Sequence, residues 1–450
     1  MSTIAAARQI LSDTFGYPDF RPLQTRVVEP VLAGRDVLAV LPTGGGKSIC
    51  FQVPALVTPG LTLVISPLVA LMQDQVGALA RRGAPAAALN SALDPAEQAA
   101  TLIAAANGTL RLLYVSPERL PRLIEDLDQR KVRVARIAVD EAHCIVEWGH
   151  DFRPSYRSLR RARAALGSPP CVALTGSATP AVRSDIRQSL GFAVDAVEIV
   201  GSFDRRNLTF EVLPVVSRDD RLARLVAQVR ASRDTVIVYA PTRGLTEGIA
   251  RVLQESGVVA SPYHAGLSSE ARLDCLQRFL AGRIRVVVAT CAFGMGIDKS
   301  DVRLVIHWTL PPTPESYYQE AGRAGRDGNS ARCLLLHHPH DALMPRRQLA
   351  TTFPPERTLE QLWRDPSTRA RHPASILAAA DRLAAELRPD RGRVDWSAVR
   401  RRRREAERRL DAMVAYARSA GCRRALLLGW FGERVVRCAG CDYCRARRPK

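Results

Sequence analysis

The first part of the chain alternates short apolar runs with longer segments that have the apolar spacing of helices. Five runs are rich in Val, Ile and Leu: Val37–Leu41, Leu61–Ser66, Arg111–Ser116, Arg136–Asp140 and Cys171–Thr175. Strands that are apolar along nearly their whole length, each followed by a helix, are typical of a parallel sheet covered on both faces. The pattern predicts an α/β domain over residues 1–205, with its ligand site beyond the carboxyl ends of the strands.

The same pattern returns in the middle of the chain. Four further runs are interpreted as buried strands: Thr235–Ala240, Arg285–Thr290, Arg303–Trp308 and Ala331–His337. Helical segments again separate them, so we expect a second parallel-sheet domain over residues 206–345. The two domains are expected to join near Gly201–Asn207.

The sequence becomes rich in Ala, Arg and Leu after residue 345 and keeps helical spacing. Prolines interrupt it at positions 354, 355, 366, 373 and 389, which predicts several short helices in place of one long helix. The run Arg400–Arg404 is expected to open a helix that reaches about Ala420. We divide this part into an arginine-rich helical insert of undetermined role, residues 346–405, and a terminal module, residues 406–450.

The net charge of the chain indicates which class of partner it could bind. The 450 residues include 65 Lys and Arg and 45 Asp and Glu, a formal net charge of +20. Residues 391–450 alone hold 18 basic and 6 acidic residues. A basic terminal region favours a polyanion, DNA or RNA before a membrane, although a solvated charged face would explain the charge equally well. No secretion signal and no membrane-spanning apolar run is expected, and six scattered cysteines favour a reducing, cytoplasmic setting.

A glycine-rich loop follows the first strand and precedes a helix. Glycines let backbone N–H groups approach phosphates, and the helix N-terminus adds the positive end of its dipole. Lys47 would contact the β- and γ-phosphates, and Ser48 would bind Mg²⁺. Leu41 stands where the strict phosphate-loop pattern has glycine, so this loop is a variant. The loop residues expected to bind nucleotide are Thr43, Gly44, Gly45, Gly46, Lys47 and Ser48.

Acidic and basic side chains at two other places complete the expected catalytic set. Asp140 and Glu141 end a predicted strand, where one carboxylate would hold Mg²⁺ and the other would orient and deprotonate the attacking water. Arg323 and Arg326 lie three residues apart, on a turn expected to be helical. They would stabilise charge on the transferred phosphoryl group, although a surface helix with ion pairs is the alternative.

Four cysteines cluster near the end of the chain with the spacing C-x15-C-x2-C-x2-C. They are Cys422, Cys438, Cys441 and Cys444. Four thiolates suit tetrahedral Zn²⁺, which would fold a segment too short for a core of its own. An iron–sulfur cluster is the competing interpretation, since C-x2-C-x2-C also occurs in such sites.

Several blocks of the sequence resemble superfamily 2 helicases, and within them the RecQ family of DNA helicases. The resemblance covers about residues 11–340 and 410–444, and its most specific block is Trp148–Pro154, an aromatic-rich loop. It implies two RecA-like domains followed by a helical zinc-binding module. By resemblance, Tyr17, Arg21 and Gln24 contact the adenine base. Other implied positions are Gly296 and Asp298 for the cofactor, and His143, Trp148, Phe152, Arg153, Ser177 and Thr179 for DNA binding or coupling.

The resemblance implies an ATP-, Mg²⁺- and Zn²⁺-dependent 3′-5′ DNA helicase that acts on single-stranded and partially duplex DNA. RNA is a disfavoured substrate, and single-strand-binding and repair proteins are the implied partners. Many relatives continue with a winged-helix domain, whereas this sequence ends six residues after Cys444, so we expect a short form. Two alternatives stay open: a DNA-stimulated ATPase or translocase that unwinds poorly, and a DNA-binding scaffold with a vestigial nucleotide site.

Overall fold

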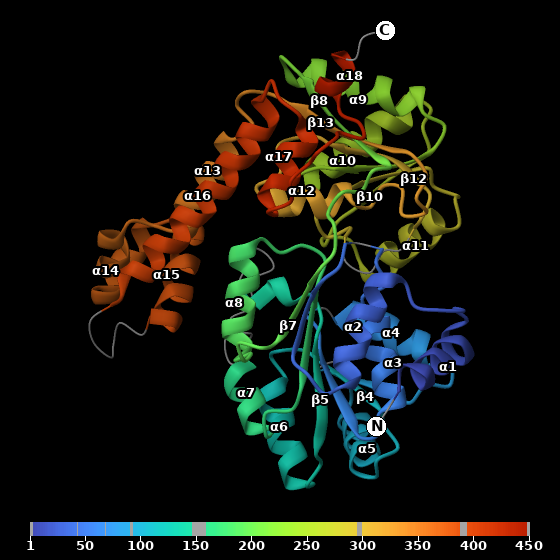
Figure 1. Cartoon of the computed structure of the whole chain (residues 1–450). Helices are drawn as coiled ribbons and strands as arrows, with labels where there is room; N and C mark the ends of the chain where they lie inside the picture. Colours follow the sequence, from blue (N-terminus) through green and yellow to red (C-terminus); the bar gives the residue numbers. More distant parts are fainter. Residues whose placement is uncertain are drawn as a thin grey trace. The chain divides into compact units, whose positions relative to one another are not determined.

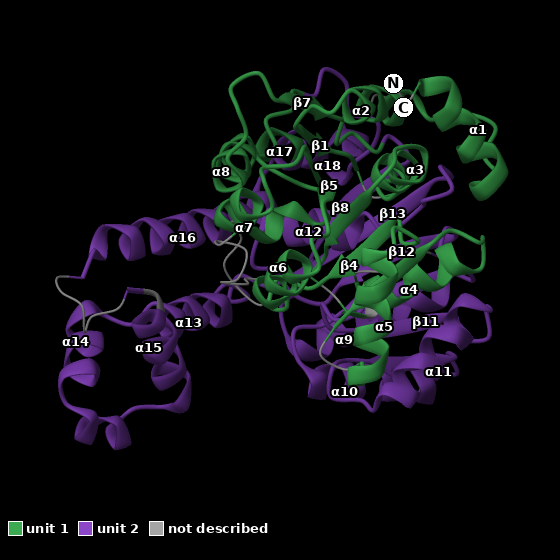
Figure 2. Cartoon of the chain, turned by 90° about the horizontal axis from the view of Figure 1, so that it is seen from below, with its two compact units in different colours: residues 1–205, 294–298, 428–434 green, residues 206–293, 299–427, 435–450 purple. Residues whose placement is uncertain are grey.

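The computed structural model describes residues 3–42, 44–67, 69–90, 93–145, 159–294, 299–387 and 394–447. These residues form two compact units, coloured separately in Figure 2. The first unit contains Met1–Arg205, Gly294–Asp298 and Leu428–Arg434, and the second contains Arg206–Phe293, Lys299–Leu427 and Val435–Lys450. Each unit has its own sheet. No helix in the described part of the chain is both long and apolar enough to cross a membrane.

The first unit is built on a seven-stranded parallel sheet in the order β3-β4-β2-β5-β6-β1-β7. The strands are β1 Val37–Val40, β2 Leu61–Ile65, β3 Ala86–Leu89, β4 Leu112–Val115, β5 Val134–Val139, β6 Cys171–Thr175 and β7 Val197–Val200. The five strands predicted from apolar runs are confirmed. The sequence analysis missed β3 and β7, which are the two edge strands. They have only four residues each, and β3 is mostly alanine.

Helices cover both faces of this sheet (Figure 1). They are α1 Ile4–Phe15, α2 Pro22–Leu32, α3 Ile49–Val57, α4 Val69–Ala80, α5 Pro95–Ala106, α6 Leu120–Gln129, α7 Leu159–Ala165 and α8 Pro180–Leu190. On one face, Val27 of α2, Phe51 of α3 and Met72 of α4 pack into one apolar cluster with β1 and β6. On the other face, α6, α7 and α8 surround Ile137 of β5. Burial on both faces explains why the central strands are apolar throughout.

The second unit has a six-stranded parallel sheet in the order β10-β11-β9-β12-β13-β8. The strands are β8 Leu208–Pro214, β9 Thr235–Tyr239, β10 Ala260–Tyr263, β11 Val286–Ala289, β12 Val302–His307 and β13 Ala331–His337. All four predicted strands are present, and the edge strands β8 and β10 are additional. The helices between them are α9 Arg218–Ala231, α10 Arg243–Glu255, α11 Ser269–Leu280 and α12 Pro314–Ala321.

Helices follow the last strand, as the sequence predicts. They are α13 Leu343–Thr352, α14 Glu356–Arg364, α15 Ala374–Leu387, α16 Trp396–Arg418, α17 Arg423–Trp430 and α18 Asp442–Ala446, with a 3₁₀ turn at Pro366–Arg371. Prolines at positions 354 and 366 follow the ends of α13 and α14. The helix expected to open at Arg400 begins four residues earlier, since the Asp395 side chain accepts a hydrogen bond from the backbone N–H of Ser397 and caps it.

Candidate functional site

The glycine-rich loop lies between β1 and α3 in the first unit, where the sequence places it. Gly44 and Gly46 have left-handed backbone conformations, with φ values of 82° and 69°. A Cβ atom on Gly45 would lie 2.8 Å from the carbonyl oxygen of Pro42, so a side chain would clash with the loop itself. The loop therefore needs glycine for conformation and for close packing. It ends at Ser48, the N-cap residue of α3.

Two of the residues expected to contact adenine contact the phosphate loop. Gln24 donates to the carbonyl oxygens of Gly45 and Gly46 at 3.2 Å, and Arg21 donates to the carbonyl oxygen of Gly44 at 2.5 Å. The Tyr17 side chain is exposed. Arg21 and Gln24 thus hold the backbone of the phosphate loop, while contact of these three residues with a base stays a prediction.

Lys47, Asp140 and Glu141 come together at the carboxyl end of the first sheet. Lys47 Nζ lies 3.7 Å from Glu141 Oε1, and both side chains are mostly buried. Burial first, and then the neighbouring Glu141 carboxylate, raise the pKa of Asp140 to about 6, against the opposing effect of Lys47. Glu141 has a φ of 46°, a conformation that is uncommon for residues other than glycine and that clusters at active sites.

A glutamine of α4 contacts the acidic pair. Gln75 of α4 donates to Asp140 Oδ2 at 3.3 Å, and its own side-chain oxygen accepts from Gln52 of α3. Gln52 also donates to the hydroxyl of Tyr114 at 2.9 Å. These hydrogen bonds between Tyr114, Gln52, Gln75 and Asp140 orient the Asp140 carboxylate. Its signal in the sequence is weak, because the three residues come from three separate elements.

His143 connects the acidic pair to the loop after β6. Its Nδ1 lies 2.8 Å from Thr175 Oγ1 and 3.3 Å from Glu141 Oε2. The Thr175 hydroxyl in turn donates to the carbonyl oxygen of Ser177. Thr179 caps α8 by accepting from the backbone N–H of Val182. A change at Glu141 can therefore reach Ser177 through His143 and Thr175, and Ser177 lies two residues before Thr179, the cap of α8.

Arg323 and Arg326 lie in the second unit, in turns that follow α12. The sequence analysis expected a helical turn here, and the structure corrects it: α12 ends at Ala321, and Gly325 has a left-handed φ of 53°. Arg323 forms a hydrogen bond with the buried hydroxyl of Tyr239. Burial first raises the pKa of Tyr239, and Arg323 opposes that rise.

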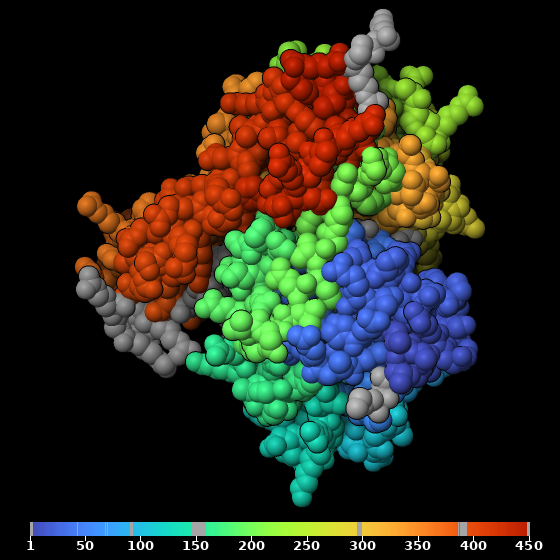
Figure 3. Space-filling view, in the orientation of Figure 1, coloured from blue at the N-terminus to red at the C-terminus, as the bar shows by residue number. Residues whose placement is uncertain are grey.

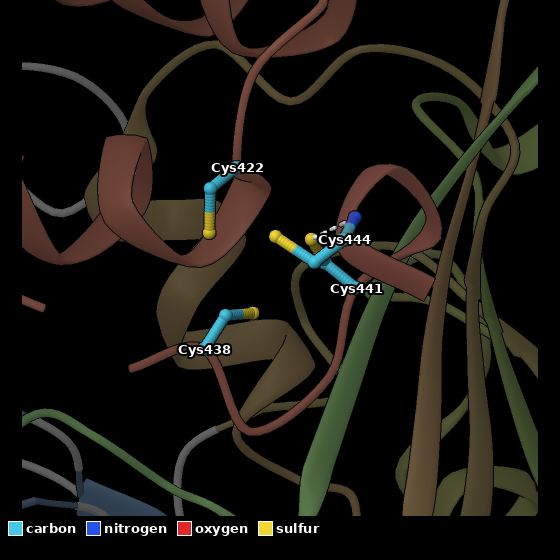
Figure 4. A group of neighbouring side chains, drawn as sticks. All are labelled: Cys422, Cys438, Cys441 and Cys444. Carbon is cyan, nitrogen blue, oxygen red and sulfur yellow. Dashed lines mark hydrogen bonds between the residues drawn. The ribbon is translucent and has the colours of Figure 1, made fainter. Parts of the chain in front are cut away.

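The four clustered cysteines point toward one another in the second unit (Figure 4). Their sulfur atoms all lie within 4.8 Å of one another. Tetrahedral zinc with Zn–S bonds of about 2.3 Å needs sulfur atoms about 3.8 Å apart, so a small contraction is enough. Burial and the neighbouring Cys422 raise the pKa of Cys438 to about 11, because nearby thiols resist ionising together. A bound dication removes that penalty, so the donor set fits zinc.

The cysteine module is attached to the edge strand β8. Cys441 forms a parallel bridge with Phe210, and Asp442 accepts a hydrogen bond from the backbone N–H of Val212 at 2.9 Å. Arg424 is fully buried, donates to the carbonyl oxygen of Leu208 and lies 5.3 Å above the ring of Phe210. The module thus covers a sheet edge that would otherwise expose unpaired backbone groups.

A contact within the first unit involves residues to which the sequence analysis assigned no role. Glu433 accepts hydrogen bonds from the Ser202 hydroxyl at 2.5 Å and from the backbone N–H of Phe203 at 2.6 Å. Phe431 stacks on Phe203 with ring centroids 4.6 Å apart. Gly432 has a φ of 81°. Residues that follow the cysteine module's first helix therefore belong to the core of the first unit.

Six expected site residues fall outside the described residues. They are Thr43, Trp148, Phe152, Arg153, Gly296 and Asp298. Their roles rest on the sequence alone.

Three stretches of the chain match known protein families. Residues 21–186 match the DEAD/DEAH box helicase family, residues 218–328 the helicase conserved C-terminal domain, and residues 388–445 the RecQ zinc-binding family. The four cysteines therefore form a zinc site. Among solved structures, the DUF1998 helicase MrfA bound to DNA is similar, with a TM-score of 0.62 and 19% identity over 76% of this chain and 52% of that one. At that identity the likeness shows the fold alone.

Curated relatives are closer in sequence. The ATP-dependent DNA helicase RecQ of Pasteurella multocida is 38% identical over 97% of this chain and 62% of its own length. That of Bacillus subtilis is 43% identical over 76% and 57%. The chain thus spans about three-fifths of the length of these relatives. A probable ATP-dependent DNA helicase RecS of Bacillus subtilis is 40% identical over 74% of this chain and 67% of its own length. Two parallel α/β sheets, a phosphate loop and a four-cysteine zinc site agree with these likenesses, and the chain belongs to the RecQ family of helicases.

Proposed function

We propose that this protein is an ATP-dependent 3′-5′ DNA helicase, which couples ATP hydrolysis to movement along single-stranded DNA and to unwinding of duplexes. The observation that carries the proposal is the hydrogen-bonded connection from Glu141 through His143 and Thr175 to Ser177. It gives hydrolysis a physical route to the segment that begins α8. The direction of movement follows from the resemblance to the family, and the DNA substrate follows from the names of the relatives, which are DNA helicases.

The residues of the first unit support specific roles in hydrolysis. The loop N–H groups and Lys47 bind the phosphates, and Lys47 exchanges its contact with Glu141 for the γ-phosphate. Glu141 orients the attacking water and accepts its proton, while a bond forms from the water oxygen to the γ-phosphorus and the bond to ADP breaks. Ser48 and Asp140 would hold Mg²⁺, which neutralises phosphate charge when bound.

The second unit and the zinc site have separate roles in this proposal. Arg323 and Arg326 stabilise the charge that develops on the transferred phosphoryl group. The zinc site folds the module that covers β8 and has no part in the chemistry. Trp148, Phe152 and Arg153 contribute stacking and phosphate contacts to single-stranded DNA. Repair and recombination are the processes in which such an activity is used.

The test compares ATP hydrolysis with strand displacement on matched substrates. The wild-type chain is expected to hydrolyse ATP faster with single-stranded DNA and to displace a strand from a duplex with a 3′ tail, but not from one with a 5′ tail. Glu141→Gln should abolish both activities while ATP still binds, and Lys47→Ala should also weaken ATP binding. Lys131→Gln, an exposed lysine far from the loop in sequence, is the control.

Three outcomes would change the conclusion. Hydrolysis without displacement would make the protein a translocase. Unchanged hydrolysis in the Lys47→Ala variant would mean that the nucleotide site is vestigial. A preference for tailed RNA duplexes would overturn DNA as the substrate.

A further inference from the structure

Helices α13 to α16 form an extension of the second unit. Figures 1 and 2 both show α14 and α15 far from that unit's sheet, with α13 and α16 leading to them. The C-terminal half of α16 is anchored near the sheet, because the Tyr416 hydroxyl donates to that of Tyr317 at 3.1 Å and Arg409 pairs with Glu315 at 3.8 Å. The N-terminal half of α16, which carries the arginine run, lies in the part that projects.

The projecting end of α16 is held rigidly. Trp396, the first residue of α16, stacks on Trp363 of α14 with centroids 5.5 Å apart and planes 8° apart. Trp363 also donates from Nε1 to the carbonyl oxygen of Ala380 in α15. The two indole rings therefore join three helices. Each ring uses one face in this stack, and both side chains are partly buried.

The arginines of α16 differ in whether they form ion pairs. Arg400 pairs with Glu356 at 3.0 Å, and Arg403 pairs with Glu407 at 2.9 Å. Arg408 pairs with Glu405 at 2.8 Å, and its side chain still keeps 54% of its surface exposed. Among the described residues, Arg404 has no ion pair and Arg401 has only an electrostatic interaction with Asp395.

Arg401, Arg404 and Arg408 share one face of α16. They are spaced three and four residues apart, which places them on the same side of a helix, and all three are exposed. We name these three residues the α16 arginine stripe. It extends over about 10 Å of helix. A DNA duplex presents about six phosphate charges over that length. Figure 3 shows the orange-red atoms of this part of the chain exposed on the surface of the projection.

We propose that the α16 arginine stripe binds the phosphate backbone of duplex DNA, as a second nucleic-acid site carried by the second unit. The proposal rests on the proposed helicase function. Adjacent positive charges repel one another on an isolated helix, and a polyanion relieves that repulsion. Duplex is favoured over single-stranded DNA because no exposed aromatic residue of α16 lies beside the stripe to stack on bases, and because duplex has the higher charge density.

The test measures binding of the full chain to a blunt duplex, without nucleotide, over a range of salt concentrations. Arg401→Gln, Arg404→Gln and Arg408→Gln together should weaken duplex binding by about tenfold or more near 0.1 M salt. The slope of log affinity against log salt should fall by about 2 to 3. Replacing the same arginines by lysine should keep most of the binding, because phosphate neutralisation needs charge rather than a guanidinium group.

The matched control removes three exposed arginines elsewhere in the same unit: Arg230→Gln, Arg233→Gln and Arg251→Gln. It should leave duplex affinity within about twofold, since phosphate neutralisation requires contact. Single-strand affinity and DNA-stimulated hydrolysis should be unchanged in both triple variants. Circular dichroism checks that α16 is still folded, and glutamine is a good helix former.

Each alternative result has a definite meaning. Equal weakening in the control variant, unchanged duplex affinity, or a loss confined to single-stranded DNA or RNA would overturn the proposal. A wild-type chain that fails to hydrolyse ATP with single-stranded DNA would overturn the proposed function instead. Duplex binding can be measured in either case, so the two failures are distinguishable.

Discussion

Replacing Asp140 by asparagine should stabilise the nucleotide-free protein while it removes the activity. Asp140 is buried beside Glu141, and its pKa is raised to about 6. Relative to an ordinary aspartate, a rise of about two pKa units costs the folded protein about 3 kcal/mol when the carboxylate is ionised. Asparagine avoids that cost but presents an N–H₂ group to Gln75, which now donates to Asp140. Loss of that hydrogen bond costs about 1 kcal/mol, leaving a net gain of about 2 kcal/mol.

The gain in folding stability of the Asp140→Asn variant should be larger at neutral pH than at acidic pH. Because the folded pKa lies above the unfolded one, the folded state binds the proton more tightly. The contribution of Asp140 to stability is therefore most favourable below about pH 4 and is lost as the pH rises to about 6. Asparagine does not titrate. The advantage of Asp140→Asn should be complete above pH 7 and should fall below about 1 kcal/mol at pH 5.

Thermal unfolding of the full chain in EDTA, without nucleotide, measures this effect. The transition of the first unit should rise by about 4–8 °C at pH 7.5 in the variant and by much less at pH 5. Asp74→Asn, an exposed position on α4, should change the transition little at either pH. A loss of stability at pH 7.5, or an equal gain at both pH values, would contradict the conclusion that the buried, ionised Asp140 carboxylate lowers the stability of the folded protein.

Three further outcomes are expected. Cys441→Ser should lower the zinc content from about one ion per chain to near zero by elemental analysis, since tetrahedral zinc needs four ligands; undiminished zinc would contradict the site. Glu433→Gln should destabilise the first unit by about 1–2 kcal/mol in urea, because Ser202 and its neighbour lose a charged acceptor, and an unchanged midpoint would contradict that contact. Trp363→Ala should speed hydrogen exchange at the start of α16 by releasing Trp396, and unchanged protection would show that the stack does not hold the helix.

The apolar runs predicted the central strands of both sheets because those strands are buried on two faces. A strand such as β6, Cys171–Thr175, has only buried residues, and four of its five residues are apolar. The edge strands carry weaker signals: the four residues of β3 are three alanines and a leucine, and β10 contains Pro262, which cannot donate to a neighbour. The strands that were missed are therefore at the sheet edges.

The sequence predicted site residues wherever residues that act together are also close together in the chain. The phosphate loop, the Asp140–Glu141 pair and the cysteine cluster each depend on residues within a short segment or on ligand spacing. Contacts between distant segments were not readable. The hydrogen bond from Gln75 to Asp140 joins residues that are 65 positions apart in the chain, and the hydrogen bond from Ser202 to Glu433 joins residues that are 231 positions apart.

The sequence by itself determined the two parallel α/β sheets, the phosphate loop and the zinc ligands, because local geometry and burial limit which residues can stand there. Only the tertiary structure decided that Arg400 of the arginine-rich helix is neutralised from another helix. Seen in sequence, Arg400 to Arg404 are equivalent members of one run. In the fold, Glu356 reaches Arg400 from another helix and Glu407 reaches Arg403 one turn along, while Arg401 and Arg404 lie on the outer face. The Arg403–Glu407 pair follows the i,i+4 spacing of a single helix, whereas the Arg400–Glu356 pair is set by how α14 and α16 pack, which no spacing rule within one segment contains.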